Sequence, residues 1–136
     1  EAYTKLEFFN IQHLAEKSYN QLSGGEKQLV LIARALMQDT DYLIMDEPTS
    51  HLDFKNQHLV MKELKKLSKN GKGVVTALHD PNLALRFCDR IIMVKKGEVI
   101  FSGENIEVMN PQNLQILYDA PVSMNKVEDI SIIYIS

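Results

Sequence analysis

Two short apolar runs, each followed at once by charged side chains, place the strongest constraint on the fold of this chain. Residues 42–45 run into the acidic pair Asp46 and Glu47, and residues 73–78 run into His79. Continuous apolar runs of this length are typical of strands that are buried on both faces of a parallel sheet. We therefore expect two buried parallel strands whose carboxyl ends carry these three polar side chains.

Helix and strand patterns alternate along the rest of the chain. Some stretches repeat apolar residues at helical spacing, and others are short and rich in β-branched residues. The expected helices cover 23–40, 53–69, 81–88 and 112–118, with one or two short helices within 1–21; the expected strands cover 42–45, 73–78 and 130–135, with a hairpin over 90–94 and 98–101. This alternation predicts an α/β fold with helices layered on a largely parallel sheet.

Composition excludes several classes of protein. The 136 residues are 45% apolar and 24% charged, which is ordinary for a globular chain, and the net charge of -3 gives no electrostatic case for nucleic acid. A single cysteine, Cys88, excludes an intrachain disulfide and favours a reducing, cytosolic compartment. No apolar run approaches the roughly 20 residues that a membrane-spanning helix needs.

The acidic pair indicates a metal or phosphate site. Open α/β sheets bind ligands at the carboxyl edge of their strands, where Asp46 and Glu47 follow the first strand. One carboxylate can hold a Mg²⁺-bound water while the other reaches a second water. His79 follows the second strand and could hydrogen-bond a phosphate oxygen or orient a water. A solvent-facing acidic turn and a structural histidine are the alternatives for these residues taken singly.

A Ser-Gly-Gly segment begins the helix that precedes the first strand. Ser23 and Glu26 form a capping-box pattern, and Gly24 and Gly25 allow backbone N–H groups to approach an anion closely. A flexible turn before a capped helix is the alternative. The phosphate-binding pattern Gly-x-x-x-x-Gly-Lys-Ser/Thr does not occur in the sequence. The sequence contains no cluster of histidine and cysteine residues, so we expect no zinc site.

Taken together and in this order, these segments resemble the ATP-binding-cassette (ABC) ATPase family. Residues 22–28 look like its signature motif, 42–48 like its Walker B strand, 50–53 like its D-loop, and His79 like its switch histidine. The resemblance runs from about residue 3 to residue 103. It implies part of a P-loop NTPase-like layered fold: the end of a helical subdomain over 1–21, half of the ATPase core over 22–103, and a C-terminal extension over 104–136.

The resemblance also implies roles for the site residues. In this family two subunits face each other head to tail and enclose ATP between them. By this resemblance, Ser23, Gly24 and Gly25 would contact the γ-phosphate of ATP bound by the opposite subunit, Asp46 would hold Mg²⁺ mainly through water, Glu47 would polarise the attacking water, His79 would contact the γ-phosphate, and Asp53 would communicate across the dimer interface.

The segments 51–57 and 79–84 look like those of ATPases that serve importers of iron–siderophore, haem or cobalamin complexes. The implied partners are a second ABC ATPase subunit, a transmembrane permease and, indirectly, a solute-binding protein, with the ATPase peripheral on the cytoplasmic face of the membrane. The sequence lacks both an initiator methionine and a P-loop. We therefore expect a piece of a longer protein that neither binds ATP and Mg²⁺ tightly nor hydrolyses ATP by itself.

Two further hypotheses stay open at this point. A soluble ABC ATPase of DNA repair, chromosome organisation or ribosomes would predict long heptad segments or tandem cassettes, and the sequence contains neither. Alternatively, the 136 residues alone would be a non-catalytic folding unit with an exposed sheet edge. Such an edge favours self-association, for which the strand 130–135 is the candidate.

Overall fold

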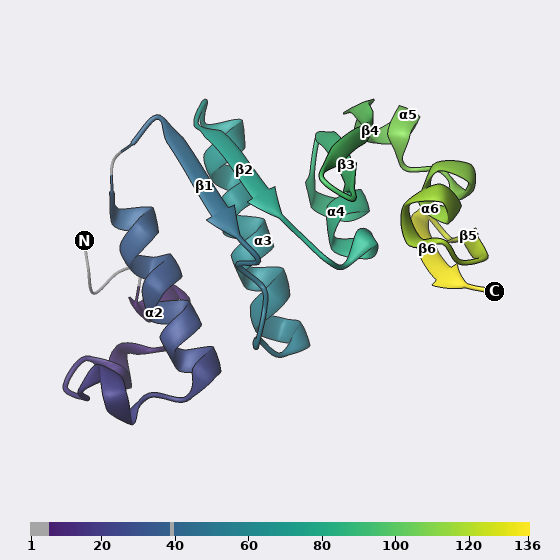
Figure 1. The fold of residues 1–136 in the computed structure, drawn as a ribbon. Helices are drawn as coiled ribbons and strands as arrows, with labels where there is room; N and C mark the ends of the chain where they lie inside the picture. Colours follow the sequence, from purple (N-terminus) through teal and green to yellow (C-terminus); the bar gives the residue numbers. More distant parts are fainter. Residues whose placement is uncertain (1–5, 39) are drawn as a thin grey trace. The chain divides into compact units, whose positions relative to one another are not determined.

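The computed structural model describes residues 6–38 and 40–136, which divide into two compact units between His79 and Asp80 (Figure 1). Each unit has its own secondary structure. The first contains η1 (Gln12–Leu14), η2 (Tyr19–Gln21), α2 (Gly24–Met37), β1 (Tyr42–Asp46), α3 (Phe54–Lys69) and β2 (Gly73–Ala77). The second contains α4 (Pro81–Phe87), β3 (Arg90–Lys95), β4 (Glu98–Glu104), α5 (Asn105–Val108), α6 (Pro111–Tyr118), β5 (Val122–Val127) and β6 (Ile130–Ile135).

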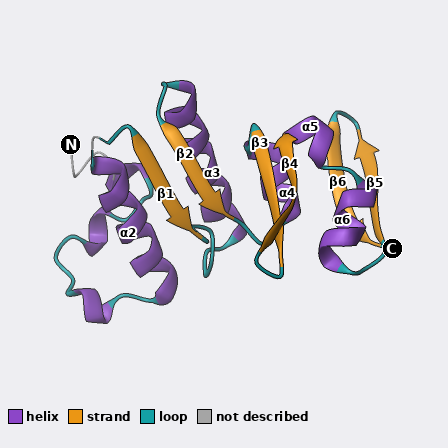
Figure 2. Cartoon of the chain, turned by 45° about the horizontal axis from the view of Figure 1, so that its top comes forward, coloured by secondary structure: helices purple, strands orange, loops and turns teal. Residues whose placement is uncertain are grey.

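A parallel pair of strands organises the first unit. β1 and β2 pair in register from Tyr42 opposite Gly73 to Asp46 opposite Ala77, so both carboxyl ends lie at one edge (Figure 2). The connection between them is α3, which packs against β2 and buries Val60 with its apolar neighbours. Parallel neighbours need a crossover of this kind, because a tight turn can only join antiparallel strands.

The expectation that these strands are buried on both faces is wrong for this chain. Tyr42 and Ile44 of β1 are 76% and 79% exposed, and Val75 of β2 is 58% exposed. The side chains alternate between exposed and half-buried along β1, because successive residues of a strand point to opposite faces. Among the described residues, α3 covers one face of the pair and leaves these apolar side chains on the other.

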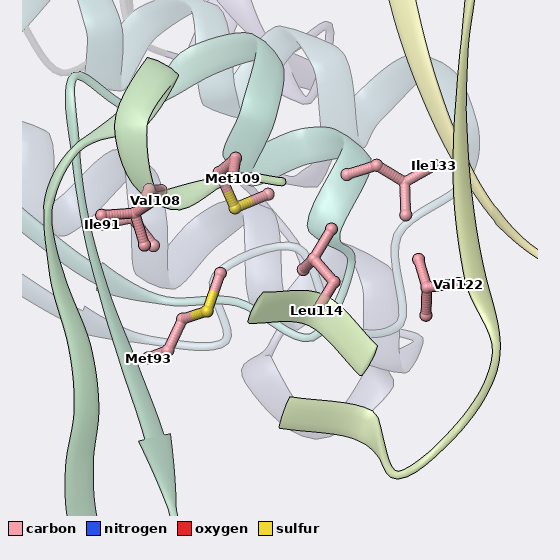
Figure 3. Close-up of a cluster of buried hydrophobic side chains, with 7 residues drawn as sticks. All are labelled: Ile91, Met93, Val108, Met109, Leu114, Val122 and Ile133. Carbon is pink, nitrogen blue, oxygen red and sulfur yellow. The ribbon is translucent and has the colours of Figure 1, made fainter. Parts of the chain in front are cut away.

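The second unit is built from two antiparallel hairpins and short helices. β3 pairs with β4 through a bulge after Met93, and β5 pairs with β6. Seven buried apolar side chains form its core (Figure 3): Ile91, Met93, Val108, Met109, Leu114, Val122 and Ile133. Each hairpin is thereby tied to a helix, and the core joins residues more than 40 positions apart.

Most of the predicted elements are present, and the α/β class is confirmed. The helix expected over 23–40 ends at Met37, and Asp39 lies outside the described residues. Two elements had no counterpart among the predictions, namely α5 and β5. No helix in the described ranges combines the length and apolar character that a bilayer crossing requires.

Candidate functional site

The carboxyl edge of the strand pair carries the predicted polar residues. Asp46 is the last residue of β1, and its side chain is exposed. Glu47 follows in the left-handed region with φ of 46°, and its N–H donates to the Ala77 carbonyl at 3.2 Å. A non-glycine residue rarely adopts this backbone conformation, which turns the chain sharply as it leaves β1. The adjacent carboxylates of Asp46 and Glu47 are therefore not held in the strict alternation of a strand.

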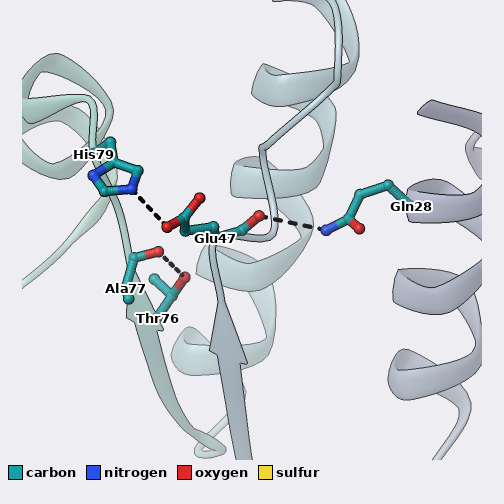
Figure 4. A network of polar contacts seen from close by, with 5 residues as sticks. All are labelled: Gln28, Glu47, Thr76, Ala77 and His79. Carbon is teal, nitrogen blue, oxygen red and sulfur yellow. Dashed lines mark hydrogen bonds and ion pairs between the residues drawn. The ribbon is translucent and has the colours of Figure 1, made fainter. Parts of the chain in front are cut away.

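The structure brings Glu47 and His79 into direct contact. The Nε2 atom of His79 lies 2.6 Å from Oε1 of Glu47 (Figure 4). The two side chains are 85% and 43% exposed, so solvent reaches the pair from outside. A carboxylate can only accept hydrogen bonds, so an ionised Glu47 requires that His79 carry its proton on Nε2. Within the described residues no recorded hydrogen bond engages Oε2 of Glu47, which leaves an acceptor for a water molecule.

The Ser-Gly-Gly segment forms the predicted helix start. The Ser23 hydroxyl accepts from the Glu26 N–H at 3.3 Å, and the Glu26 carboxylate accepts from the Ser23 N–H at 2.7 Å. Gly24 and Gly25 occupy the first turn of α2, where N–H groups have no partner within the helix. A side chain on Gly25 would come within 3.0 Å of the His51 carbonyl oxygen, whereas the space beside Gly24 is open.

Glu26 adds a negative charge to this turn. The hydrogen bonds from the Ser23 backbone and hydroxyl lower the pKa of the Glu26 carboxyl below its usual value. The carboxylate also takes the Ser23 N–H as a donor. An anion approaching the turn would therefore meet the N–H groups of Gly24 and Gly25, because the hydroxyl proton of Ser23 is donated to the Glu26 carboxylate.

The loop between β1 and α3 is held by side chains of α2 and α3. Gln28 of α2 donates to the carbonyls of Glu47 and Pro48 at 3.4 and 3.2 Å. Gln57 of α3 donates to the Thr49 carbonyl at 3.3 Å. Both glutamines lie in segments that carry the family resemblance, 22–28 and 51–57, but these contacts were not predicted. The available signal was their position, about one helical turn from the start of α2 and of α3.

Asp53 is the N-cap of α3. Its side chain accepts from the Asn56 N–H at 2.8 Å and from the Asn56 side-chain amide at 3.2 Å. Two residues earlier His51 has φ of 61°, so the loop contains a second left-handed residue besides Glu47. The predicted interface role of Asp53 stays a prediction.

The arrangement fits a Mg²⁺ ion that is held largely by water and substrate. Mg²⁺ in nucleotide-dependent enzymes commonly binds one or two carboxylates together with phosphate oxygens and waters. Asp46 and Glu47 provide two carboxylates at one accessible edge. The described part of the chain contains no group of three metal-ligating side chains. A Mg²⁺ ion that is held mainly by water and phosphate oxygens does not require such a group.

Comparison of the fold with solved structures indicates the class of protein. It superposes on a putative metal-chelate type ABC transporter in an inward-facing conformation with a TM-score of 0.81 and 29% identity, covering 99% of this chain and 55% of that one. The chain therefore has part of an ABC ATPase-like fold, with one parallel and two antiparallel strand pairs among its described residues.

Sequence comparison indicates the same class of protein. A family model for the ABC transporter matches residues 1–50. An uncharacterised ABC transporter ATP-binding protein of Methanocaldococcus jannaschii is 42% identical over 129 residues, which are 94% of this chain and 50% of the relative. A probable iron chelatin transport ATP-binding protein of Helicobacter pylori is 37% identical over 135 residues, 98% of this chain and 53% of the relative. This chain is similar to the ATP-binding subunits of ABC transporters and spans about half the length of these relatives.

Proposed function

We propose that this chain supplies the signature turn, the acidic strand and the switch histidine of an ATP-hydrolysing subunit in an importer of metal chelates. The observation that carries this proposal is the contact between Glu47 and His79 at the carboxyl edge of β1 and β2. The similarity to an iron chelatin transport protein and to a metal-chelate type transporter supports the substrate class. Iron–siderophore, haem and cobalamin complexes are the candidate cargoes.

The proposed chemistry is the transfer of a phosphoryl group to water, in which positioning and electrostatics do most of the catalytic work. Glu47 would accept a hydrogen bond from the attacking water through its second carboxylate oxygen while His79 fixes the first. Asp46 would hold Mg²⁺ through water, and the ion would neutralise charge on the phosphates. His79 would contact the γ-phosphate through Nδ1 while Nε2 stays on Glu47, an arrangement that requires a proton on both ring nitrogens because both partners are acceptors.

The remaining roles concern a second subunit. Ser23, Gly24 and Gly25 would offer donors to the γ-phosphate of ATP bound by the facing subunit, because the positive end of α2 favours an anion there. Asp53 would lie near the interface between the two subunits. The ATPase would dock on a permease at the cytoplasmic face of the membrane, and a solute-binding protein would deliver the chelate to that permease.

Hydrolysis also needs a loop that holds the phosphates, and its sequence pattern is absent from these 136 residues. We therefore expect no turnover from the chain alone. The test joins the chain to the remainder of the Methanocaldococcus jannaschii relative, which the family resemblance predicts to carry a P-loop. Phosphate release at saturating Mg-ATP is then measured for the chain and for this chimera.

The expected result is turnover by the chimera only, with a fall of about 100- to 1,000-fold on Glu47→Gln. Asp41→Asn is the matched control, because Asp41 is an exposed acid at the other end of the same strand. Unchanged release in the Glu47→Gln chimera would refute the assigned role. ATP hydrolysis by the 136 residues alone would refute the need for a separate P-loop, provided that Glu47→Gln abolishes it.

A further inference from the structure

The loop after β1 contains two residues with an unfavourable backbone conformation. Glu47 at its start and His51 near its end both have positive φ, a conformation that costs free energy for residues with a Cβ atom. Such residues persist only where surrounding contacts fix them. Internal hydrogen bonds supply part of this, since the Ser50 N–H donates to the Glu47 carbonyl at 3.0 Å and the Leu52 N–H to the Thr49 carbonyl at 3.4 Å.

Three successive carbonyls of this loop accept from glutamine side chains. Gln28 binds those of Glu47 and Pro48, and Gln57 binds that of Thr49. Pro48 and Thr49 are buried, so water does not easily replace these donors. Gln28 thus engages the carbonyl of the residue whose carboxylate contacts His79 (Figure 4).

We propose that Gln28 is a positioning residue that fixes the Glu47 carboxylate through its backbone and links it to the Ser-Gly-Gly turn. This inference rests on the proposed function of Glu47 as the residue that orients water. The link to the turn has two points of contact on α2: the Gln28 amide on Glu47 and Pro48, and the close approach of Gly25 to the His51 carbonyl. The start of α2 and the acidic loop are therefore joined, and a shift of one displaces the other.

A substitution of Gln28 by methionine tests this role, because methionine keeps the length of the side chain and removes the donor. Gln38→Met is the matched control, since Gln38 is exposed at the other end of α2 and does not reach the loop. Gln28→Lys restores a donor of similar reach and should recover part of the wild-type behaviour.

The first measurement is amide hydrogen exchange in the 136-residue chain without nucleotide. In Gln28→Met the N–H groups of Ser50 and Leu52 should exchange about tenfold faster, because two hydrogen bonds of ordinary strength are lost. Amides in the middle of α3 should keep their rates, which separates a local effect from a loss of overall stability. Unchanged exchange at Ser50 and Leu52 would overturn the proposal that Gln28 fixes the loop.

The second measurement is ATP turnover in the chimera. Gln28→Met should lower kcat by about 10- to 100-fold, because small misplacements of a reacting group are costly, while KM changes by less than about twofold. A rise in KM at constant kcat would instead make Gln28 a binding residue and overturn the positioning role. A chimera that lacks turnover even without substitutions would count against the proposed function, whereas the exchange measurement still decides whether Gln28 holds the loop.

Discussion

The close approach between Gly25 and the loop gives a prediction with an internal control. A Cβ atom on Gly25 would lie 3.0 Å from the His51 carbonyl oxygen and 3.9 Å from the Leu52 side chain, whereas one on Gly24 would meet nothing within 4 Å. The two glycines are neighbours in the first turn of one helix. Alanine substitutions at the two sites therefore differ mainly in this contact.

Both substitutions reduce the entropy of the unfolded chain, which stabilises the folded state by about 0.4–1 kcal/mol where the backbone permits alanine. Gly24→Ala should show this gain. In Gly25→Ala a carbonyl must move by a few tenths of an ångström, and its loop is held at Glu47, Pro48 and Thr49 by glutamine side chains. Overpacking of this kind costs about 1–3 kcal/mol, so the two variants should differ by about that amount.

Urea denaturation followed by circular dichroism measures the difference. With a slope of about 1–3 kcal/mol/M, the midpoint of Gly25→Ala should lie about 0.5–2 M below that of Gly24→Ala. Hydrogen exchange at Leu52 should rise in Gly25→Ala alone. Equal midpoints for the two variants would show that the loop yields freely, and the picture of a clamped loop would be refuted.

Two further predictions concern the second unit. Leu114 is fully buried, so Leu114→Ala should lower the free energy of unfolding by about 2–5 kcal/mol in urea denaturation, whereas Ile116→Ala on the exposed side of α6 should change it by about 0.5 kcal/mol or less. Lys95 donates to the Asp119 carboxylate at 2.6 Å, and this bond and the lysine charge hold the pKa of Asp119 below its usual 3.8. Because the folded-state pKa is lowered, the stabilisation is present above the usual value and disappears as pH falls through the folded value. Lys95→Met should therefore flatten the decline of stability below about pH 4, as denaturation at several pH values would show; an unaltered pH profile would contradict this account.

Local patterns in the sequence were sufficient to predict the sheet edge that carries the candidate site residues. The apolar runs before Asp46 and His79 predicted the strands, and the parallel pairing of those strands brings Glu47 to His79. The capping box at Ser23 and Glu26 likewise predicted the start of α2, since its donors and acceptors lie within four residues. Features of this kind depend on residues that are close in sequence, so the sequence shows them directly.

Features that depend on distant packing were missed. β5 contains Asn125 and Lys126 and lacks a clear alternation, so only its pairing with the apolar β6 identifies it as a strand. The two-sided burial expected for β1 depends on what covers each face, and no periodicity within β1 contains that information. The loop contacts of Gln28 span about 20 positions of sequence, a separation at which side-chain type alone indicates little.

The side chain of Asn82 in α4 has a consequence for how the chain behaves in solution. Its amide pairs with both backbone groups of Ile133, at 3.0 Å to the carbonyl and 2.8 Å from the N–H, as a neighbouring strand would. A second molecule that tried to extend the sheet through the middle of β6 would first have to displace this amide. The other apolar residues of β6 are exposed, but the backbone groups of Ile133 are already paired. This pairing works against the addition of a second copy to the sheet at this edge.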